Sequence, residues 1–188
     1  MTLEHRRQIV HLLFGVALLV TGALYGLETL TALLVAAFAL GLLAIAAWSM
    51  GFRPNLVRIC LETFERNTAR FPGQGALMFV TGALFLALFS GSLAFTLAVL
   101  AILSFGDGFA TLAGVAGKHK LWFNPSKTWE GLVAFFCAGA IAAAFFVPLQ
   151  AAAFYAAFLS VIEAVGLPAD DNILIPVAAV VMRSLVGG

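Results

Sequence analysis

Long runs without a charged residue dominate this chain, and short stretches between them hold nearly all of its charged side chains. A hydrocarbon core about 30 Å thick is crossed by roughly 17 to 25 helical residues. Divided at that length, the uncharged runs predict single spans at 9–26, 30–50 and 173–186. The run 71–106 is long enough for two spans separated at Ser90-Gly91-Ser92, and the run 132–162 for two separated at Pro148. The segment 173–186 is short and contains Pro176 and Arg183, so the pattern predicts six to seven transmembrane helices.

Residues 55–70 follow a different, helical periodicity. Apolar side chains fall on one side (Leu56, Val57, Cys60, Leu61, Phe64) and charged ones on the other (Arg58, Glu62, Glu65, Arg66, Arg70). This pattern predicts an amphipathic helix lying on the membrane interface. Its simplest role is a lipid-anchored connector, and a lid over a substrate is the alternative.

The composition agrees with a membrane protein, because 63% of the residues are hydrophobic and only 10% are charged. Soluble chains are about a quarter charged. A soluble enzyme, a disordered binder and a secreted disulfide scaffold are therefore excluded, and a net charge of +1 offers no basis for a nucleic-acid partner. Cys60 and Cys137 lie far apart in the sequence, so we expect each to be a small apolar side chain in the packing between helices. We expect one all-α, polytopic domain over residues 1–188, with the lipid bilayer as its solvent.

The basic residues give this bundle an orientation, since lysine and arginine are retained on the cytoplasmic side. Nine of the ten precede the first span, follow the second or follow the fourth: Arg6, Arg7, Arg53, Arg58, Arg66, Arg70, Lys118, Lys120 and Lys127. The N-terminus, residues 51–70 and residues 114–131 are predicted to be cytoplasmic, so the functional site is expected there.

Asp107 is the first candidate for chemistry, because it follows 36 uncharged residues, 71–106. A carboxylate at the end of a span is costly and indicates a functional site. Gly106 and Gly108 on either side allow a ligand close to the backbone. A divalent cation with bound phosphates would suit this residue, and capping of the next helix or pairing with a lysine is the alternative.

The stretch 114–131 combines three lysines, several glycines and a polar helix start, which are the features that phosphate recognition requires. The alternative ligand is an anionic lipid headgroup. The candidate phosphate-binding residues are Gly117, Lys118, Lys120, Asn124, Pro125, Ser126, Lys127, Thr128 and Gly131.

Further acids lie close to the same predicted face. Glu130 is a candidate metal ligand or acid–base group, or else a surface partner of Lys127. The turn Asp170-Asp171-Asn172 offers the hard oxygen ligands that Mg²⁺ takes, unless it only faces solvent. Glu163 ends the sixth predicted span and is expected to face the interior of the bundle.

His11 lies in the first predicted span, one helical turn after Arg7. A single histidine in a span is usually a packed, hydrogen-bonded group. A position near the substrate is the alternative.

Taken in order, several of these motifs resemble the dolichol kinase and phytol kinase family, the CTP-dependent polyprenol kinases of membranes. The resemblance is carried by Gly106-Asp107-Gly108, by Gly117-Lys118-His119-Lys120 and by residues 124–131, Asn-Pro-Ser-Lys-Thr-Trp-Glu-Gly. Three further stretches are similar: Glu4-x-Arg6-Arg7-x3-His11-x3-Gly15, residues 72–76 (Pro-Gly-Gln-Gly-Ala) and Asp170-Asp171-Asn172-x3-Pro176. The match begins almost at residue 1. In this respect the chain resembles the compact phytol kinases more than the longer dolichol kinases.

The resemblance implies transfer of the γ-phosphoryl group of CTP to the hydroxyl of a membrane isoprenoid alcohol, with Mg²⁺ as cofactor. It implies nucleotide binding by Gly106, Gly108 and the candidate phosphate-binding residues above, with Lys127 also catalytic. Metal binding falls to Asp107, Glu130, Asp170, Asp171 and Asn172. Asp107 or Glu130 is the expected general base, and Arg7, His11 and Glu163 are expected near the acceptor substrate.

Two alternatives stay open. The 106–108 and 127–131 motifs also look like those of phosphatidate cytidylyltransferases, which transfer CMP to a lipid phosphate. Those enzymes end in a Lys-Asp pair, a His-Gly-Gly and an Asp-Arg that this chain lacks, so the kinase is favoured. A non-catalytic carrier or lipid-binding protein is the second alternative. Neither the acceptor alcohol nor a homo-oligomer follows from the sequence.

Overall fold

A computed structural model describes residues 3–65 and 69–186 of the chain, and within them every regular element is helical. The predicted all-α class is confirmed. The helices are α1 (Leu3–Ser49), α2 (Asn55–Phe64), α3 (Gln74–Phe89), α4 (Leu93–Ala101), the π-helical stretch η1 (Ile102–Gly106), α5 (Asp107–Ala116), α6 (Trp129–Ala143), α7 (Leu149–Val165) and α8 (Asp171–Val186).

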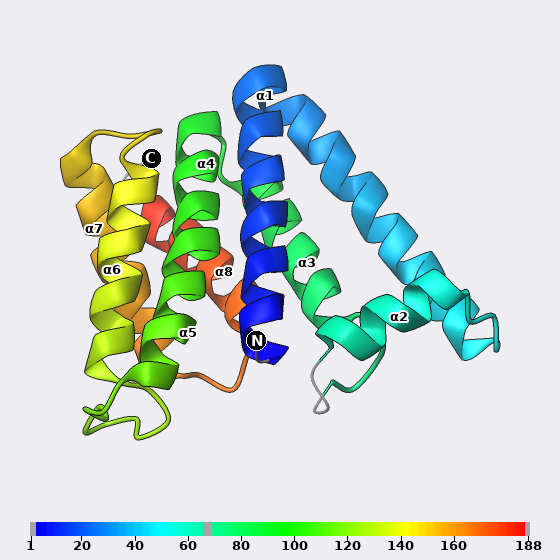
Figure 1. The fold of residues 1–188 in the computed structure, drawn as a ribbon. Helices are drawn as coiled ribbons and strands as arrows, with labels where there is room; N and C mark the ends of the chain where they lie inside the picture. The colour runs from blue at the N-terminus through cyan, green and yellow to red at the C-terminus, as the bar shows by residue number, and fades with distance from the viewer. Residues whose placement is uncertain (1–2, 66–68, 187–188) are drawn as a thin grey trace.

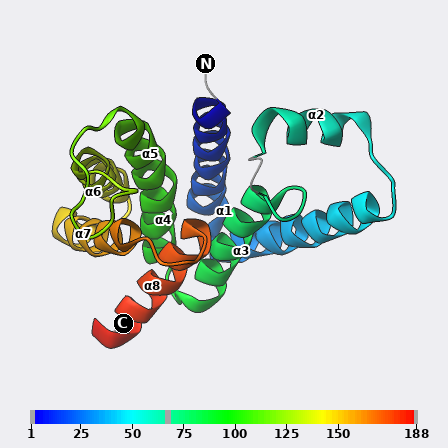
Figure 2. The same cartoon turned by 90° about the horizontal axis from the view of Figure 1, so that it is seen from below.

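Helix α1 contains two of the predicted spans as two arms that diverge from a sharp bend (Figure 1). The bend is at Gly26, whose φ of 84° and ψ of 178° are not helical. A residue with a Cβ is strained at such a positive φ, so glycine suits this position. The second arm diverges from the first and runs beside α3, where a Cβ on Gly41 would lie 3.1 Å from the Leu77 side chain, and α2 follows its far end (Figures 1 and 2).

The centre of the bundle is one continuous helical rod, Leu93–Ala116, made of α4, η1 and α5. Every residue from 95 to 104 is buried, and α1, α3, α6, α7 and α8 all contact the rod. A helix that is apolar all round packs in this way. Gly15 of α1 allows close contact, because a Cβ there would lie 2.1 Å from Ser104 Oγ of the rod.

The expected breaks at residues 90–92 and at Pro148 are confirmed. Gly91 has a φ of 66°, and the Ser92 side chain caps α4 by accepting the Phe95 N–H at 3.4 Å. Pro148 is the N-cap of α7. The connections from α3 to α4 and from α6 to α7 lie at the end of the bundle opposite to the N-terminus (Figure 1).

The helix that contains the fourth predicted span does not end at Gly106. Gly106 and Asp107 both have right-handed helical φ and ψ, so the rod continues through them to Ala116. The π-helical turn that precedes Asp107 changes the direction in which later side chains point, and such turns are frequent at functional sites. Asp107 is therefore held by helix on both sides.

The interfacial helix predicted over residues 55–70 is shorter than expected and ends at Phe64. Glu65 is extended, and its carboxylate accepts the N–H of Gln74 at 3.0 Å. The Gln74 side chain in turn accepts the N–H of Arg70 at 2.7 Å. These contacts favour a turn into α3 over continued helix. Arg66 lies outside the described residues.

Two helical segments of the described chain are long and apolar enough to cross a membrane, by length and composition alone: His5–Ser49 and Leu93–Ala116. The apolar helices Gln74–Phe89, Trp129–Ala143 and Leu149–Val165 are shorter. The N-terminus, α2, the α5–α6 loop and the start of α8 lie at one end of the molecule (Figure 1). Most of the charged side chains therefore gather at that end.

Replacing Gly82 with alanine tests the close contact between α3 and α8. A Cβ at this position would lie 1.8 Å from the carbonyl oxygen of Asn172, so α8 would have to shift. Because such overpacking typically costs about 1–3 kcal/mol, we expect Gly82→Ala to lower the free energy of unfolding by that amount. The measurement is thermal unfolding of the purified protein in detergent.

Gly75→Ala is the matched control in the same helix, since nothing lies within 4 Å of its added Cβ. Alanine favours helix over glycine, so this variant should be unchanged or slightly more stable. Equal melting temperatures for the two variants would contradict the close contact.

Candidate functional site

Three carboxylates from separate helices meet at the charged end of the bundle. Asp107 starts α5, Glu163 lies near the end of α7, and Asp171 starts α8. One oxygen from each lies within 4.8 Å of the others. We call these residues the carboxylate cluster. Oxygen donors at this spacing are those that a hard divalent cation takes, so the donor set fits Mg²⁺.

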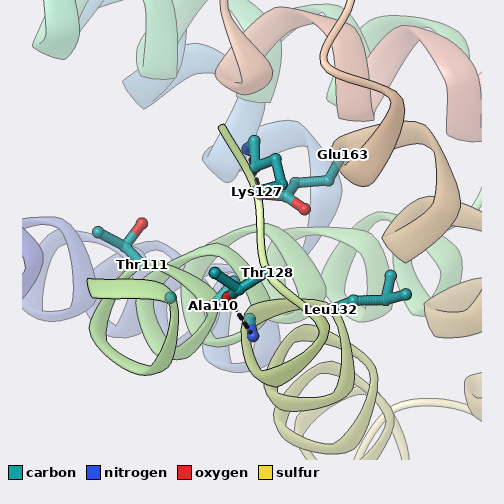
Figure 3. A pocket seen from close by; sticks show the side chains of 8 residues that line it. Ala110, Thr111, Lys127, Thr128, Leu132 and Glu163 are labelled. Carbon is teal, nitrogen blue, oxygen red and sulfur yellow. Dashed lines mark hydrogen bonds and ion pairs between the residues drawn. The ribbon is translucent and has the colours of Figure 1, made fainter. Parts of the chain in front are cut away.

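The ammonium of Lys127 reaches into the carboxylate cluster. It forms an ion pair with Glu163 Oε1 (Figure 3) and lies 3.4 Å from Asp171 Oδ2. Burial opposes its positive charge, but the carboxylates of Glu163 and Asp171 outweigh this effect and raise the pKa of Lys127 above its ordinary value. The lysine is therefore charged at neutral pH.

A hairpin-like loop between α5 and α6 carries Lys127 to this place. Leu121 donates its N–H to the Lys127 carbonyl at 3.1 Å, and Trp129 donates to the His119 carbonyl at 2.9 Å. The Asn124 side chain donates to the Ala164 carbonyl at 2.9 Å, which joins the tip of the loop to the end of α7. The Lys127 side chain therefore starts from a fixed backbone.

A small cavity of about 170 Å³ lies beside the cluster, between α5, α6 and this loop (Figure 3). Thr111, Gly114, Lys127, Thr128, Gly131 and Glu163 line it. Thr128 also caps α6 by accepting the Gly131 N–H at 3.1 Å. The cavity thus combines an ammonium, hydroxyls and a helix N-terminus, which are groups that bind phosphate oxygens.

Glu130 is engaged elsewhere. Its Oε1 accepts the N–H of Lys118 at 3.0 Å and of His119 at 3.2 Å, and lies 2.7 Å from His119 Nδ1. These contacts, the Lys118 N–H foremost, hold the pKa of Glu130 at about 2. The structure therefore brings Asp107 and Asp171 together with Glu163. Glu130 instead binds the backbone of Lys118 and His119 at the base of the loop.

The residues of the turn 170–172 make different contacts. Asp170 Oδ1 accepts both the backbone N–H of Asn172 at 3.0 Å and its side-chain N–H at 2.9 Å. Asp170 therefore precedes α8 and accepts hydrogen bonds from its first turn, and Asp171 reaches the cluster. Asn172 Oδ1 is buried and has no hydrogen-bond partner among the described residues.

The remaining predicted residues lie around this centre. His11 packs edge-on against the Phe79 ring, with centroids 4.5 Å apart, and its Nε2 is 3.4 Å from the Leu103 carbonyl. Arg7 and Asp170 act on it electrostatically. His11 therefore lies near the site, in the packed environment that is usual for such a histidine.

The predicted nucleotide-binding residues divide into packing and exposed positions. Gly106 faces the Phe135 ring and Gly108 faces Leu12, so both serve helix packing. Lys118 and Lys120 are exposed, as are Pro125 and Ser126 at the loop tip. The Ser126 hydroxyl donates to Asn124 Oδ1 at 2.5 Å. A Cβ on Gly117 would lie 2.8 Å from Glu130 Oε2.

The sequence did not predict that Glu163 would share a site with Asp107 and Asp171. The signal was present, because Glu163 is an acid in an otherwise uncharged helix. Which acids it would meet depends on how α7 and α8 pack.

A larger cavity of about 630 Å³ has apolar walls, which include Val16, Leu19, Phe105, Phe109, Cys137 and Ile141. At about 100° per residue, Phe105 and Phe109 lie nearly opposite to Asp107 around the helix. This cavity therefore opens on the other flank of the rod from the carboxylate cluster.

Comparison with known proteins finds a relative of unknown function. A protein of Methanocaldococcus jannaschii described as uncharacterized is 26% identical over 141 residues, which are 73% of this chain and 70% of that protein. No protein-family model matches the chain. No solved structure matches it either.

Replacing Glu130 with glutamine should loosen the base of the α5–α6 loop, because a neutral amide oxygen accepts hydrogen bonds more weakly than the carboxylate that holds Lys118 and His119. We expect hydrogen exchange at the amides of Lys118 and His119 to become several-fold faster at pH 7. Exchange is measured by mass spectrometry on peptides from this loop. Glu28→Gln, at an exposed position of α1, is the control and should leave these rates unchanged.

The same contact predicts a pH dependence. The folded pKa of Glu130 is lowered from 4.5 to about 2, so the attachment is complete above pH 4.5 and weakens as the pH falls toward 2. The ratio of exchange rates between E130Q and the wild type should fall toward one over that interval. A ratio that does not change with pH would argue against the contact.

Proposed function

We propose that this protein is a CTP-dependent kinase that transfers the γ-phosphoryl group of CTP to the hydroxyl of a membrane isoprenoid alcohol. The carboxylate cluster with the Lys127 ammonium carries this proposal. Phosphoryl transfer asks a protein chiefly to position its substrates and to place positive charge around the phosphates. The sequence resemblance to the polyprenol kinases supplies the identity of the donor and of the acceptor class.

Asp107, Asp171 and Glu163 would hold Mg²⁺, and their hard oxygen donors suit it. When bound, Mg²⁺ supplies charge neutralisation at the phosphate oxygens. Lys127 would hold a γ-phosphate oxygen, and the cavity beside it would take part of the phosphate chain. Lys118 and Lys120, on the same loop, would attract the nucleotide from solution.

Asp107 is the better candidate for the general base. Glu130 accepts three hydrogen bonds and has a pKa of about 2, which makes it a weak base. In the proposed step, a carboxylate of the cluster takes the proton of the alcohol hydroxyl and the oxygen attacks the γ-phosphorus. The bond from that phosphorus to the β–γ bridging oxygen breaks, and CDP leaves.

The proposed setting is a membrane crossed six to seven times, with the N-terminus, α2 and the α5–α6 loop on the cytoplasmic side. Two apolar helices of spanning length and three shorter ones support it. The gathering of basic residues at one end of the bundle supports the orientation. A soluble nucleotide and a lipid-dissolved alcohol would then meet at the interface where the carboxylate cluster lies.

The experiment uses purified protein in detergent or vesicles with Mg²⁺, a panel of isoprenoid alcohols and phosphatidate, and CTP labelled at either the α- or the γ-phosphate. We expect label in the lipid from the γ position only. Label from the α position would identify a cytidylyltransferase, and no transfer from either would favour a carrier or lipid-binding protein. Both results would contradict the proposal.

Asp107→Asn and Asp171→Asn test the role of the carboxylate cluster in that assay. Each should lower the rate of transfer by about a hundredfold or more, because each removes a charged ligand that positions the reacting phosphates. Glu28→Gln also removes one acid and should leave the rate unchanged. Full activity of Asp107→Asn would exclude both the metal and the base assignment.

A further inference from the structure

The Lys127 ammonium already lies among the oxygens that a divalent cation would use. It contacts Glu163 Oε1 (Figure 3) and Asp171 Oδ2, and one oxygen of the Asp107 carboxylate lies within 4.8 Å of an oxygen of each of the other two. An ammonium and a divalent cation both take carboxylate oxygens as neighbours. Two positive charges that share these oxygens would also repel each other.

We infer that Lys127 and the divalent cation compete for the carboxylate cluster, and that cation binding releases the Lys127 ammonium toward the nucleotide phosphates. The second half of this inference rests on the proposed function, because only a phosphate donor gives the released ammonium a ligand. The first half concerns the protein and the cation alone. Lys127 is then the residue that makes cation and nucleotide binding depend on each other.

The surroundings of Lys127 allow this movement. Its side chain is 28% exposed, so it is not enclosed by protein. The cavity of about 170 Å³ beside it is lined by Thr111 and Thr128, whose hydroxyls can accept hydrogen bonds from the ammonium. A lysine has a flexible stem of four carbons, so its charge can move while its backbone stays in place.

The backbone of Lys127 is held from both sides. Its N–H donates to the Asn124 carbonyl at 3.0 Å, and its carbonyl accepts the Leu121 N–H at 3.1 Å. Leu121 is 1% exposed and anchors this part of the loop. Displacement of the ammonium therefore requires side-chain rotation and no rearrangement of the loop.

The competition is tested with Mn²⁺ alone, without nucleotide, in detergent. Binding is followed by the electron paramagnetic resonance signal of free Mn²⁺ for the wild type and for Lys127→Met. We expect Lys127→Met to bind Mn²⁺ about tenfold more tightly or better, because it removes a positive charge from the cation's own site. Equal or weaker binding by this variant, or no Mn²⁺ binding by either protein, would overturn the inference.

Arg53→Met is the matched control for the loss of one positive charge. Arg53 lies beyond the end of α1, with its guanidinium 5.2 Å from the centre of the Trp48 ring. Its replacement should leave Mn²⁺ affinity as in the wild type. A similar increase in both variants would show that net charge, and not Lys127, controls the affinity.

A second measurement uses the wild type only and so does not depend on how a variant folds. An amine-reactive acylating reagent is applied with and without Mn²⁺, and each lysine is quantified by mass spectrometry. Reactivity of Lys127 should rise several-fold at saturating Mn²⁺, while the exposed Lys118 and Lys120 serve as internal references. Unchanged reactivity of Lys127 would contradict its release.

These outcomes separate the inference from the proposed function, since neither experiment contains CTP. If labelled CTP transfers to no lipid and Lys127→Met still binds Mn²⁺ more tightly, the kinase proposal fails and the competition stands. If transfer occurs and the Mn²⁺ affinity does not change in Lys127→Met, the competition fails and the kinase proposal stands.

The inference also predicts a coupling between the two ligands. In the wild type, Mn²⁺ and CTP should each raise the other's affinity, and Lys127→Met should reduce that coupling.

Discussion

The ion pair between Lys127 and Glu163 joins residues 36 positions apart and connects the α5–α6 loop to the helices behind it. The Glu163 side chain is only 6% exposed, and a buried carboxylate is stable only when a positive charge or hydrogen bonds compensate it. Lys127 supplies that charge and also lies near Asp171. Lys127 thus compensates a charge that the packing of α7 and α8 buries, while the Asn124 side chain separately holds the tip of the loop to α7.

The central rod gives that contact a rigid support. Its first part is apolar on all sides and is enclosed by other helices, while Asp107 follows directly after the π-helical turn. The same helix thus serves as the core of the bundle and as the base of the polar site. Seen from the charged end, α5, α6 and α7 lie on one side of the start of α8, and α1 and α3 lie on the other (Figure 2).

Apolar and polar chemistry are separated along the length of this molecule. The connections from α3 to α4 and from α6 to α7 lie at one end, and α2, the α5–α6 loop and the start of α8 lie at the other (Figure 1). A reaction between a water-soluble phosphate donor and a lipid-dissolved acceptor needs such a boundary, because each substrate is stable in only one of the two solvents. This separation is the physical basis of the proposed interfacial kinase.

The uncharged runs, their breaks at glycine, serine and proline, and the all-helical class could be predicted from the sequence, because each depends on neighbouring residues. The end of α2 at Phe64 and the continuation of helix through Gly106 could not, since they depend on Gln74 and on packing around the rod. Glu130 and Glu163 look alike in sequence, as acids at the margin of uncharged runs. Only the tertiary structure decided that Glu163 meets Asp107 while Glu130 binds the loop backbone, because that choice is made by contacts between distant segments.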